Sequence, residues 1–189
     1  MRFFLSILAV IIFIVVVIVL VASHSSGGPV IKPINLANYT YPGTSVTQTT
    51  SGQLVGNNQR QAIRITISAT ERDIYFLNTY DNTIQSSQTF PNTSTAYNTF
   101  LGALQNANFT FSRKTTQTNI YGVCPLGNTY QYQLDSPSTT VFNNWSTSCS
   151  SSDGDFAGNG PLIRQLFSLQ IPTYNTFIQP ANTINTFIL

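Results

Sequence analysis

The segment from Asp153 to Gly160 holds the residues whose types and spacing come nearest to a chemical site. Asp153 and Asp155 flank a glycine and are followed by Asn159. Carboxylate and amide oxygens at close spacing are the ligands that Ca²⁺ prefers, so these three residues form a candidate calcium site. The segment departs from an EF-hand loop, because Arg164 stands where the closing Glu belongs. An acidic turn before a helix is the alternative, since carboxylates favour a helix N-terminus.

Six carboxylates provide the candidates for general acid and base chemistry. Glycoside hydrolysis needs two of them about 5–10 Å apart. All six fall in predicted turns or at strand ends, where solvated acidic residues are also common. They are Glu71, Asp73, Asp81, Asp135, Asp153 and Asp155. A carbohydrate-active enzyme or glycan-binding domain that uses these acidic turns is therefore one hypothesis for the function.

Other catalytic arrangements lack a required residue. The single histidine, His24, precedes the candidate domain, which excludes a Ser-His-Asp or Cys-His arrangement and a typical catalytic zinc site there. The sequence contains no Gly-rich phosphate loop with Lys. Arg60, Arg64 and Arg72 lie on or beside one predicted hairpin, where they either clamp an anionic ligand or form a solvated strand face. We assign no catalytic residue and expect no cofactor.

Cys124 and Cys149 are the only cysteines, and we expect them to form a disulfide. Two cysteines outside a membrane bond to each other when no other partner competes. The bond would close a loop of about 25 residues, for which chain entropy gives about 3.5 kcal/mol. A reactive or metal-binding pair is the alternative, but the candidate domain offers no histidine to accompany it.

The apolar N-terminal segment determines the expected location. Residues 3–22 are apolar apart from Ser6. Such a helix spans about 30 Å, the thickness of the hydrocarbon core of a bilayer. We predict a transmembrane signal-anchor helix at 1–22 that contacts the lipid bilayer through residues 3–22. A signal peptide cleaved near Ser23 is the alternative, although its apolar region is usually shorter. Either way, the following residues lie outside a cell membrane, and Arg2 favours the cytoplasmic side.

Composition indicates a folded extracytoplasmic domain after this segment. Charged residues make up 7% of the chain and aromatic residues 12%, whereas about 25% charged residues are usual. Disordered segments are poor in aromatic residues, so we expect folding. No basic stripe is present, and we expect no nucleic-acid partner. We predict a flexible stalk at 23–42, a domain at 43–178 and a C-terminal tail at 179–189.

Alternating apolar residues predict a sheet. Ile63, Ile65 and Ile67 are separated by polar residues, which is typical of a half-buried strand. The first strands follow one another with short turns, so we expect antiparallel pairing. We read residues 126–128 as a hairpin turn. The predicted strands are 44–50, 62–69, 74–77, 83–90, 109–112, 120–124 and 129–134.

Two helices are predicted beside the sheet. The first follows Pro91, and its apolar residues Tyr97, Phe100, Leu101 and Leu104 recur with the helical period. The second follows Asn159-Gly160, opens with Pro161 and stops before Pro172. We therefore expect an α+β fold: an N-terminal transmembrane helix, then a mostly antiparallel sheet with two helices packed on one face.

A series of short motifs lies in a defined order between residues 44 and 174. The motifs are Arg64-Ile65-Thr66-Ile67, Ser87-Gln88-Thr89-Phe90-Pro91-Asn92, Ala96-Tyr97, Phe100-Leu101, Ala103-Leu104, Phe109, Gly122-Val123-Cys124-Pro125, Trp145-Ser146-Thr147-Ser148-Cys149, Gly158-Asn159, Leu166-Phe167 and Gln170-Ile171-Pro172. In this order they resemble a group of small membrane-anchored extracytoplasmic proteins of Candidate Phyla Radiation bacteria, Saccharibacteria in particular. The resemblance implies a bacterial cell surface and carries no activity.

These observations favour a surface-anchored extracytoplasmic interaction or structural module without evident catalytic activity. Tyr supplies contact area at low entropic cost, and Asn and Thr supply adaptable hydrogen bonds. The expected partner is a cell-envelope polymer or a surface protein. The alternative is the carbohydrate-active enzyme or glycan-binding domain. Two carboxylates in one groove would favour the enzyme, and a surface without such a pair would favour the module.

Overall fold

A computed structural model describes residues 33–54, 60–79 and 81–179 of the chain. The predicted anchor at 1–22, the first part of the predicted stalk and residues 180–189 of the predicted tail lie outside these ranges. The described residues all belong to one of the two units into which the chain divides, Ile31–Leu189. Within the described ranges, no helix is both long enough and apolar enough to cross a membrane.

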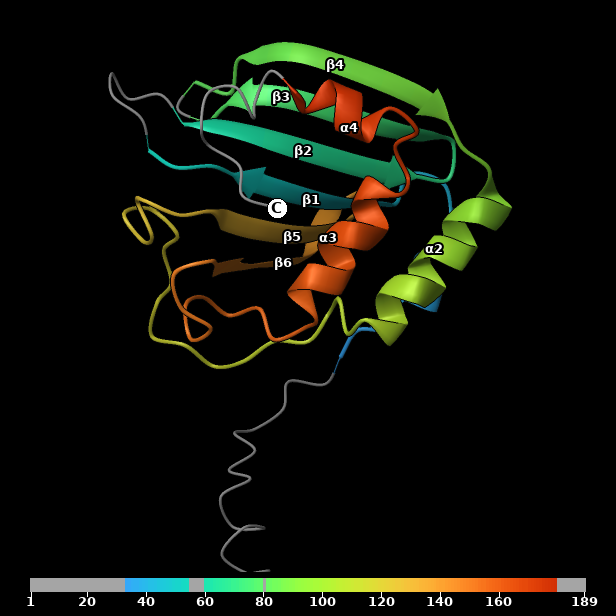
Figure 1. Cartoon of the computed structure of the whole chain (residues 1–189). Helices are drawn as coiled ribbons and strands as arrows, with labels where there is room; N and C mark the ends of the chain where they lie inside the picture. The colour runs from blue at the N-terminus through green and yellow to red at the C-terminus, as the bar shows by residue number, and fades with distance from the viewer. Residues whose placement is uncertain (1–32, 55–59, 80, 180–189) are drawn as a thin grey trace, which may run out of the picture. The chain divides into compact units, whose positions relative to one another are not determined.

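A six-stranded antiparallel sheet forms the centre of this unit (Figure 1). Its spatial order is β4-β3-β2-β1-β5-β6, so β1 pairs with both β2 and β5. The first four strands follow one another as hairpins, and the chain then crosses to the other side of β1. The strands are β1 (Ser45–Ser51), β2 (Gln61–Ser68), β3 (Glu71–Asn78), β4 (Ile84–Pro91), β5 (Thr129–Ser136) and β6 (Thr139–Thr147).

Helices accompany the sheet as predicted. α3 (Gly160–Ser168) and the short α4 (Tyr174–Phe177) lie over one face of the sheet, and α2 (Ser94–Asn106) lies beside α3 (Figure 1). The 3-10 helix η1 (Leu36–Tyr39) precedes the first strand. The predicted α+β class, with an antiparallel sheet and two main helices, is therefore confirmed.

The hydrophobic core lies between the helices and one face of the sheet. Ile65 on β2 is buried opposite Ile74 on β3, and Tyr132 on β5 is fully buried beside β1. The predicted stripe on α2 is also buried, comprising Tyr97, Phe100, Leu101 and Leu104. Phe167 on α3 packs edge-on against Phe100 of α2, with ring centroids 5.1 Å apart. The periodicity of the sequence thus identified most of the inward-facing positions.

The predicted strands at 109–112 and 120–124 are wrong. Ser112 forms only an isolated bridge with Phe156, and residues 121–124 form a turn and a bend. Gly122 and Cys124 both adopt a positive φ, which a continuous strand does not accommodate. Residues 126–128 consequently do not connect two strands. The sequence analysis also missed β6, whose Asn143-Asn144 pair resembles loop composition.

The end of the predicted stalk belongs to the folded unit. Leu36 is fully buried, and its backbone N–H donates to Gln105 Oε1 on α2 at 2.8 Å. Thr110 Oγ1 donates to the Ile34 carbonyl oxygen at 2.9 Å. The Asn35 side chain accepts a hydrogen bond from Ala37 N and thereby caps η1. The domain therefore begins ahead of residue 43, where composition placed its start.

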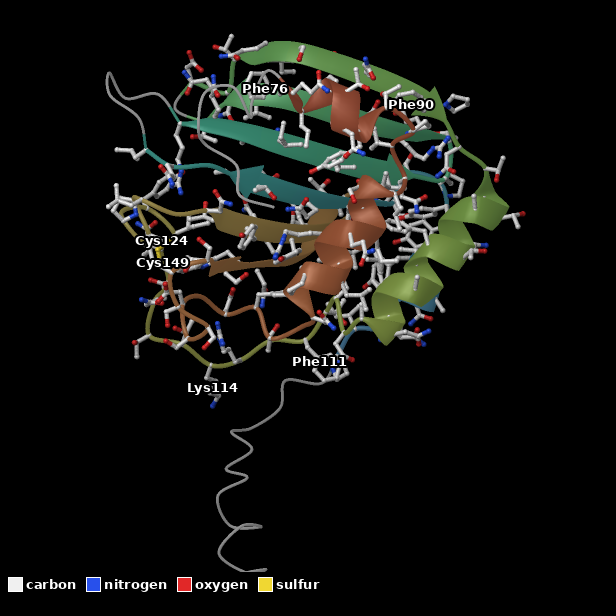
Figure 2. All side chains as sticks on the ribbon, in the orientation of Figure 1. Phe76, Phe90, Phe111, Lys114, Cys124 and Cys149 are labelled. Carbon is white, nitrogen blue, oxygen red and sulfur yellow. A yellow bond between two sulfur atoms is a disulfide. The ribbon has the colours of Figure 1, made fainter. Side chains whose placement is uncertain are left out.

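The predicted disulfide between Cys124 and Cys149 is confirmed (Figure 2). The two Cα atoms are 5.6 Å apart, and the residues are 25 positions apart in sequence. Cys124 precedes β5 and Cys149 follows β6, so the bond closes the open end of this hairpin. Gly127 packs against it, because an added Cβ would lie 2.5 Å from the Cys124 sulfur.

We expect stability to fall at alkaline pH because of three tyrosines. Burial raises the pKa of Tyr97, Tyr132 and Tyr174 above the ordinary value of 10.0. The folded state therefore holds these protons more tightly than the unfolded state. Their contribution is fully present below about pH 10 and is lost as the pH rises toward the folded pKa. Each phenol lowers the free energy of unfolding by at most about 1.4 kcal/mol per pH unit there.

Urea unfolding of the full-length chain at pH 7 to 11 measures this effect. The Tyr97→Phe variant should show a shallower decline above pH 10, because it retains the ring and lacks the ionisable group. An unfolding free energy that is constant from pH 9 to 11 contradicts the prediction.

Candidate functional site

A cavity of about 310 Å³ opens between the sheet and the helices α3 and α4. This volume is at the lower end of the range for small-molecule sites. Gln48 and Thr50 of β1 and Tyr130 of β5 line it from the sheet, and Arg164 of α3 and Tyr174 of α4 line it from the helices. The other lining residues are Ile63, Pro161, Gln165, Ser168, Asn175 and Ile178.

Gln48 is a buried polar residue at the floor of this cavity. It lies in the central part of the sheet, opposite Ile65 on β2 and Tyr132 on β5, and is only 4% exposed. Its Nε2 donates to Thr50 Oγ1 at 2.7 Å. An amide has a second N–H and a carbonyl oxygen to offer. A polar side chain at an inward position costs stability compared with an apolar one, so its placement at a cavity suggests ligand recognition.

Arg164 brings a positive charge to the cavity. Its guanidinium carbon lies 4.0 Å from the centroid of the Tyr130 ring, a cation–π contact. Its Nη1 donates to the Tyr132 hydroxyl at 3.3 Å. Gly160 leaves room for this pair, since an added Cβ would lie 3.1 Å from the Tyr132 hydroxyl and 3.2 Å from Arg164 Nη1. The two tyrosines therefore hold the guanidinium in place.

Local sequence explains how α3 presents Arg164. Asn159 caps the helix, since its Oδ1 accepts from Leu162 N at 3.2 Å. Pro161 occupies the first turn, where its missing N–H costs nothing. Ile163 and Phe167 are fully buried and fix the rotation of the helix. Arg164 follows Ile163 directly and is half-buried at the cavity.

The cavity carries positive charge without a compensating acid. Among the described residues, no Asp or Glu lines it. Burial raises the pKa of Tyr132, and the charge of Arg164 partly offsets this effect. Tyr174 is affected in the same two ways. Both phenols are thus neutral at physiological pH, and Arg164 is the single charged group among the described lining residues.

The predicted calcium-site residues lie elsewhere and have protein partners. Asp153 Oδ2 accepts from Thr147 Oγ1 at 2.6 Å, and Asp155 Oδ1 accepts from Trp145 N at 2.8 Å. Asn159 is the cap of α3. Within the described ranges, no cluster of three or more His, Cys, Asp or Glu residues is placed to hold a metal ion.

Arg113 also contacts the acidic segment. Its guanidinium donates to the backbone carbonyl oxygens of Ser151, Asp153 and Gly154, at 2.6 Å for Asp153 and 2.9 Å for Gly154. The Phe156 N–H donates to the Trp145 carbonyl oxygen at 3.0 Å. The acidic segment is therefore attached along β6, and Arg113 contacts the carbonyl groups of Asp153 and Gly154.

The remaining carboxylates lie outside the cavity lining. Glu71 and Asp73 are two residues apart on β3 and therefore share one face of the sheet. Asp73 on β3 faces away from the helices and accepts from Thr89 Oγ1 at 2.6 Å. Asp135 on β5 accepts from Gln133 and Thr140. Three strand spacings separate β3 from β5, which places the backbones of these two residues at least about 14 Å apart. Asp81 accepts from Thr83 N in a turn, and its pKa is lowered by that hydrogen bond.

The three hairpin arginines do not converge on one point. Arg60 Nε donates to the Gly52 carbonyl oxygen at 2.8 Å. Arg72 donates to the carbonyl oxygens of Pro91 and Gln170. Arg64 lies opposite Tyr75, on the face away from the helices. A shared anion clamp formed by Arg60, Arg64 and Arg72 is therefore not present in this arrangement.

The cavity residues were missed by the sequence analysis. Gln48 and Thr50 lie at alternate positions of the same strand as the apolar Val46, which is buried. This spacing was the one sequence signal that they face inward. From the sequence, Arg164 was notable only because it replaces the closing Glu of a calcium loop. Comparison of the chain with protein-family models, with curated proteins and with solved structures finds no match.

Proposed function

We propose that this protein is a non-catalytic binding module, and that the cavity beside α3 is its ligand site. One observation carries the proposal: the nearly buried Gln48 amide and the half-buried Arg164 guanidinium face a common cavity that no described carboxylate lines. Such groups can orient and hold a ligand. They lack the acid and base pair that glycoside hydrolysis requires.

The location of this module follows from the sequence expectations. The apolar residues 3–22 would hold it at a cell membrane, with the folded domain outside. The motif order that resembles membrane-anchored proteins of Candidate Phyla Radiation bacteria supports a bacterial surface. In that setting the ligand is a cell-envelope polymer or a surface molecule.

Replacing Gln48 with Met tests the ligand site. Methionine has a similar volume and no hydrogen-bonding amide, so we expect retention of the full-length chain on immobilised envelope polysaccharide to fall about 3- to 10-fold. The free energy of unfolding should stay the same or rise, since a buried polar group is removed. The matched control is Gln85→Met, because Gln85 is exposed on β4 at a distance from the cavity.

Equal retention of both variants contradicts the assignment of the cavity. The enzyme hypothesis has its own test: Asp73, Asp81, Asp135, Asp153 and Asp155 are replaced by Asn one at a time. If one replacement abolishes a measured release of reducing ends while the melting temperature is unchanged, the protein is an enzyme and the proposed function is wrong.

A further inference from the structure

We propose that the cavity binds a carboxylate-bearing saccharide unit and that Arg164 holds its carboxylate. This inference rests on the proposed function, because it names the ligand of the same site. It goes beyond that function by assigning the charge and the chemical class of the ligand. Three features of the described residues support it.

The first feature is the unused capacity of the guanidinium. Among the described residues, Arg164 donates one hydrogen bond, from Nη1 to the Tyr132 hydroxyl at 3.3 Å. Arginine has five N–H donors in a planar fork that matches a carboxylate. The guanidinium carbon lies 4.0 Å from the centroid of the Tyr130 ring, and a contact with a ring face uses no hydrogen-bond acceptor. A ligand carboxylate can therefore accept two hydrogen bonds and also neutralise the charge.

The second feature is the set of neutral polar side chains in the lining, which lie there together with the apolar Ile63, Pro161 and Ile178. Gln48 and Thr50 lie on the floor, and Gln165, Ser168 and Asn175 contribute amide and hydroxyl groups from the helices. Hydroxyl groups of a sugar both donate and accept hydrogen bonds, as these side chains do. Tyr174 adds an aromatic side chain to the wall. This combination fits a polar ring compound better than an aliphatic acid.

The third feature argues against a peptide. The strands below the cavity are β1, β2 and β5, and each is paired on both sides within the sheet. Their backbone N–H and C=O groups therefore face neighbouring strands. An extended peptide is usually held by backbone hydrogen bonds along a free strand edge. Here recognition depends on side chains, which suits a compact sugar residue.

The test compares two probes that differ in whether their carboxyl groups are charged or esterified. Tetragalacturonic acid and its methyl ester are titrated into the full-length chain in detergent, and binding is measured by calorimetry. We expect the acid to bind at least about tenfold more tightly than the ester. Arg164→Gln should weaken binding of the acid about 10- to 100-fold and leave binding of the ester nearly unchanged. Arg164→Lys should bind with intermediate affinity, because it keeps the charge and loses the fork.

Arg64→Gln is the matched control, since it removes the same charge from the opposite face of the sheet. This variant should bind the acid as the unmodified chain does.

Equal affinity for acid and ester, with both sensitive to Gln48→Met, retains the proposed function and overturns the inference. Stronger binding of trialanine than of trialanine amide, without binding of the saccharide acid, overturns it in favour of a peptide. Binding of none of the four probes overturns it as well, and envelope-polysaccharide retention then decides the proposed function separately. The comparison of acid with ester uses the unmodified chain, so it decides the inference even if Arg164→Gln fails to fold.

Discussion

The double variant Cys124→Ala/Cys149→Ala is expected to lose about 2–5 kcal/mol of unfolding free energy. The disulfide restricts the unfolded chain over a separation of 25 residues, and chain entropy assigns about 3.5 kcal/mol to this restriction. It joins the segments that lead into β5 and out of β6, so its loss frees both ends of the hairpin. Urea unfolding of the full-length chain without reductant provides the measurement.

Reduction of the unmodified chain is the control for this prediction. Dithiothreitol should lower its unfolding free energy by a similar amount and should leave the double variant unchanged. If the unmodified chain and the double variant unfold at the same urea concentration without reductant, the bond contributes nothing to stability and the prediction is wrong.

The regular elements were predictable because their apolar periodicity is strong. Ile63, Ile65 and Ile67 on β2 alternate without interruption, and each is buried. The stripe on α2 contains four apolar residues at helical spacing, which few strand patterns imitate. Cys124 and Cys149 had no competing partner, so their pairing followed from counting. In these cases the local pattern and the tertiary environment favour the same structure.

β6 was missed because it has buried residues on both of its faces. Phe142 packs in the core, whereas Trp145 lies under the acidic segment that follows the strand. Burial on both sides removes the alternation that marks a half-exposed strand. The strand predicted at 120–124 was wrong for a different reason. Its apolar residues resemble a strand pattern, but the positive φ of Gly122 and Cys124 prevents an extended backbone there.

The cavity could not be derived from sequence because its residues come from separate elements. Gln48 belongs to β1 and Arg164 to α3, and only the crossover after β4 brings β5 beside β1. A calcium site was predicted at the acidic segment because its alternating Asp residues resemble metal ligands. Sequence alone does not reveal that Asp155 accepts the Trp145 N–H and thereby protects an edge strand.

Gly154 is the position in this segment where we expect a single methyl group to have a large effect. Its φ of +76° lies in the region that side chains rarely adopt, and an added Cβ would overlap the backbone carbonyl of Trp145. The left-handed conformation costs about 1–2 kcal/mol for alanine, and the overlap costs about 1–3 kcal/mol more. Gly154→Ala should therefore lower the unfolding free energy by about 2–5 kcal/mol, as measured by urea unfolding.

Two other glycines separate the causes of this loss. Gly122 has a φ of +77° and nothing within 4 Å of an added Cβ, so Gly122→Ala should show the conformational cost alone. Gly102 on α2 also has open space around an added Cβ, and Gly102→Ala should raise stability by about 0.5–1 kcal/mol. If Gly154→Ala costs no more than Gly122→Ala, the close approach of the acidic segment to β6 does not contribute to stability. The variants are compared in metal-free buffer, so that calcium binding does not contribute to the difference. A larger loss for Gly154→Ala than for Gly122→Ala then shows that a glycine is required between Asp153 and Asp155 because of this close packing.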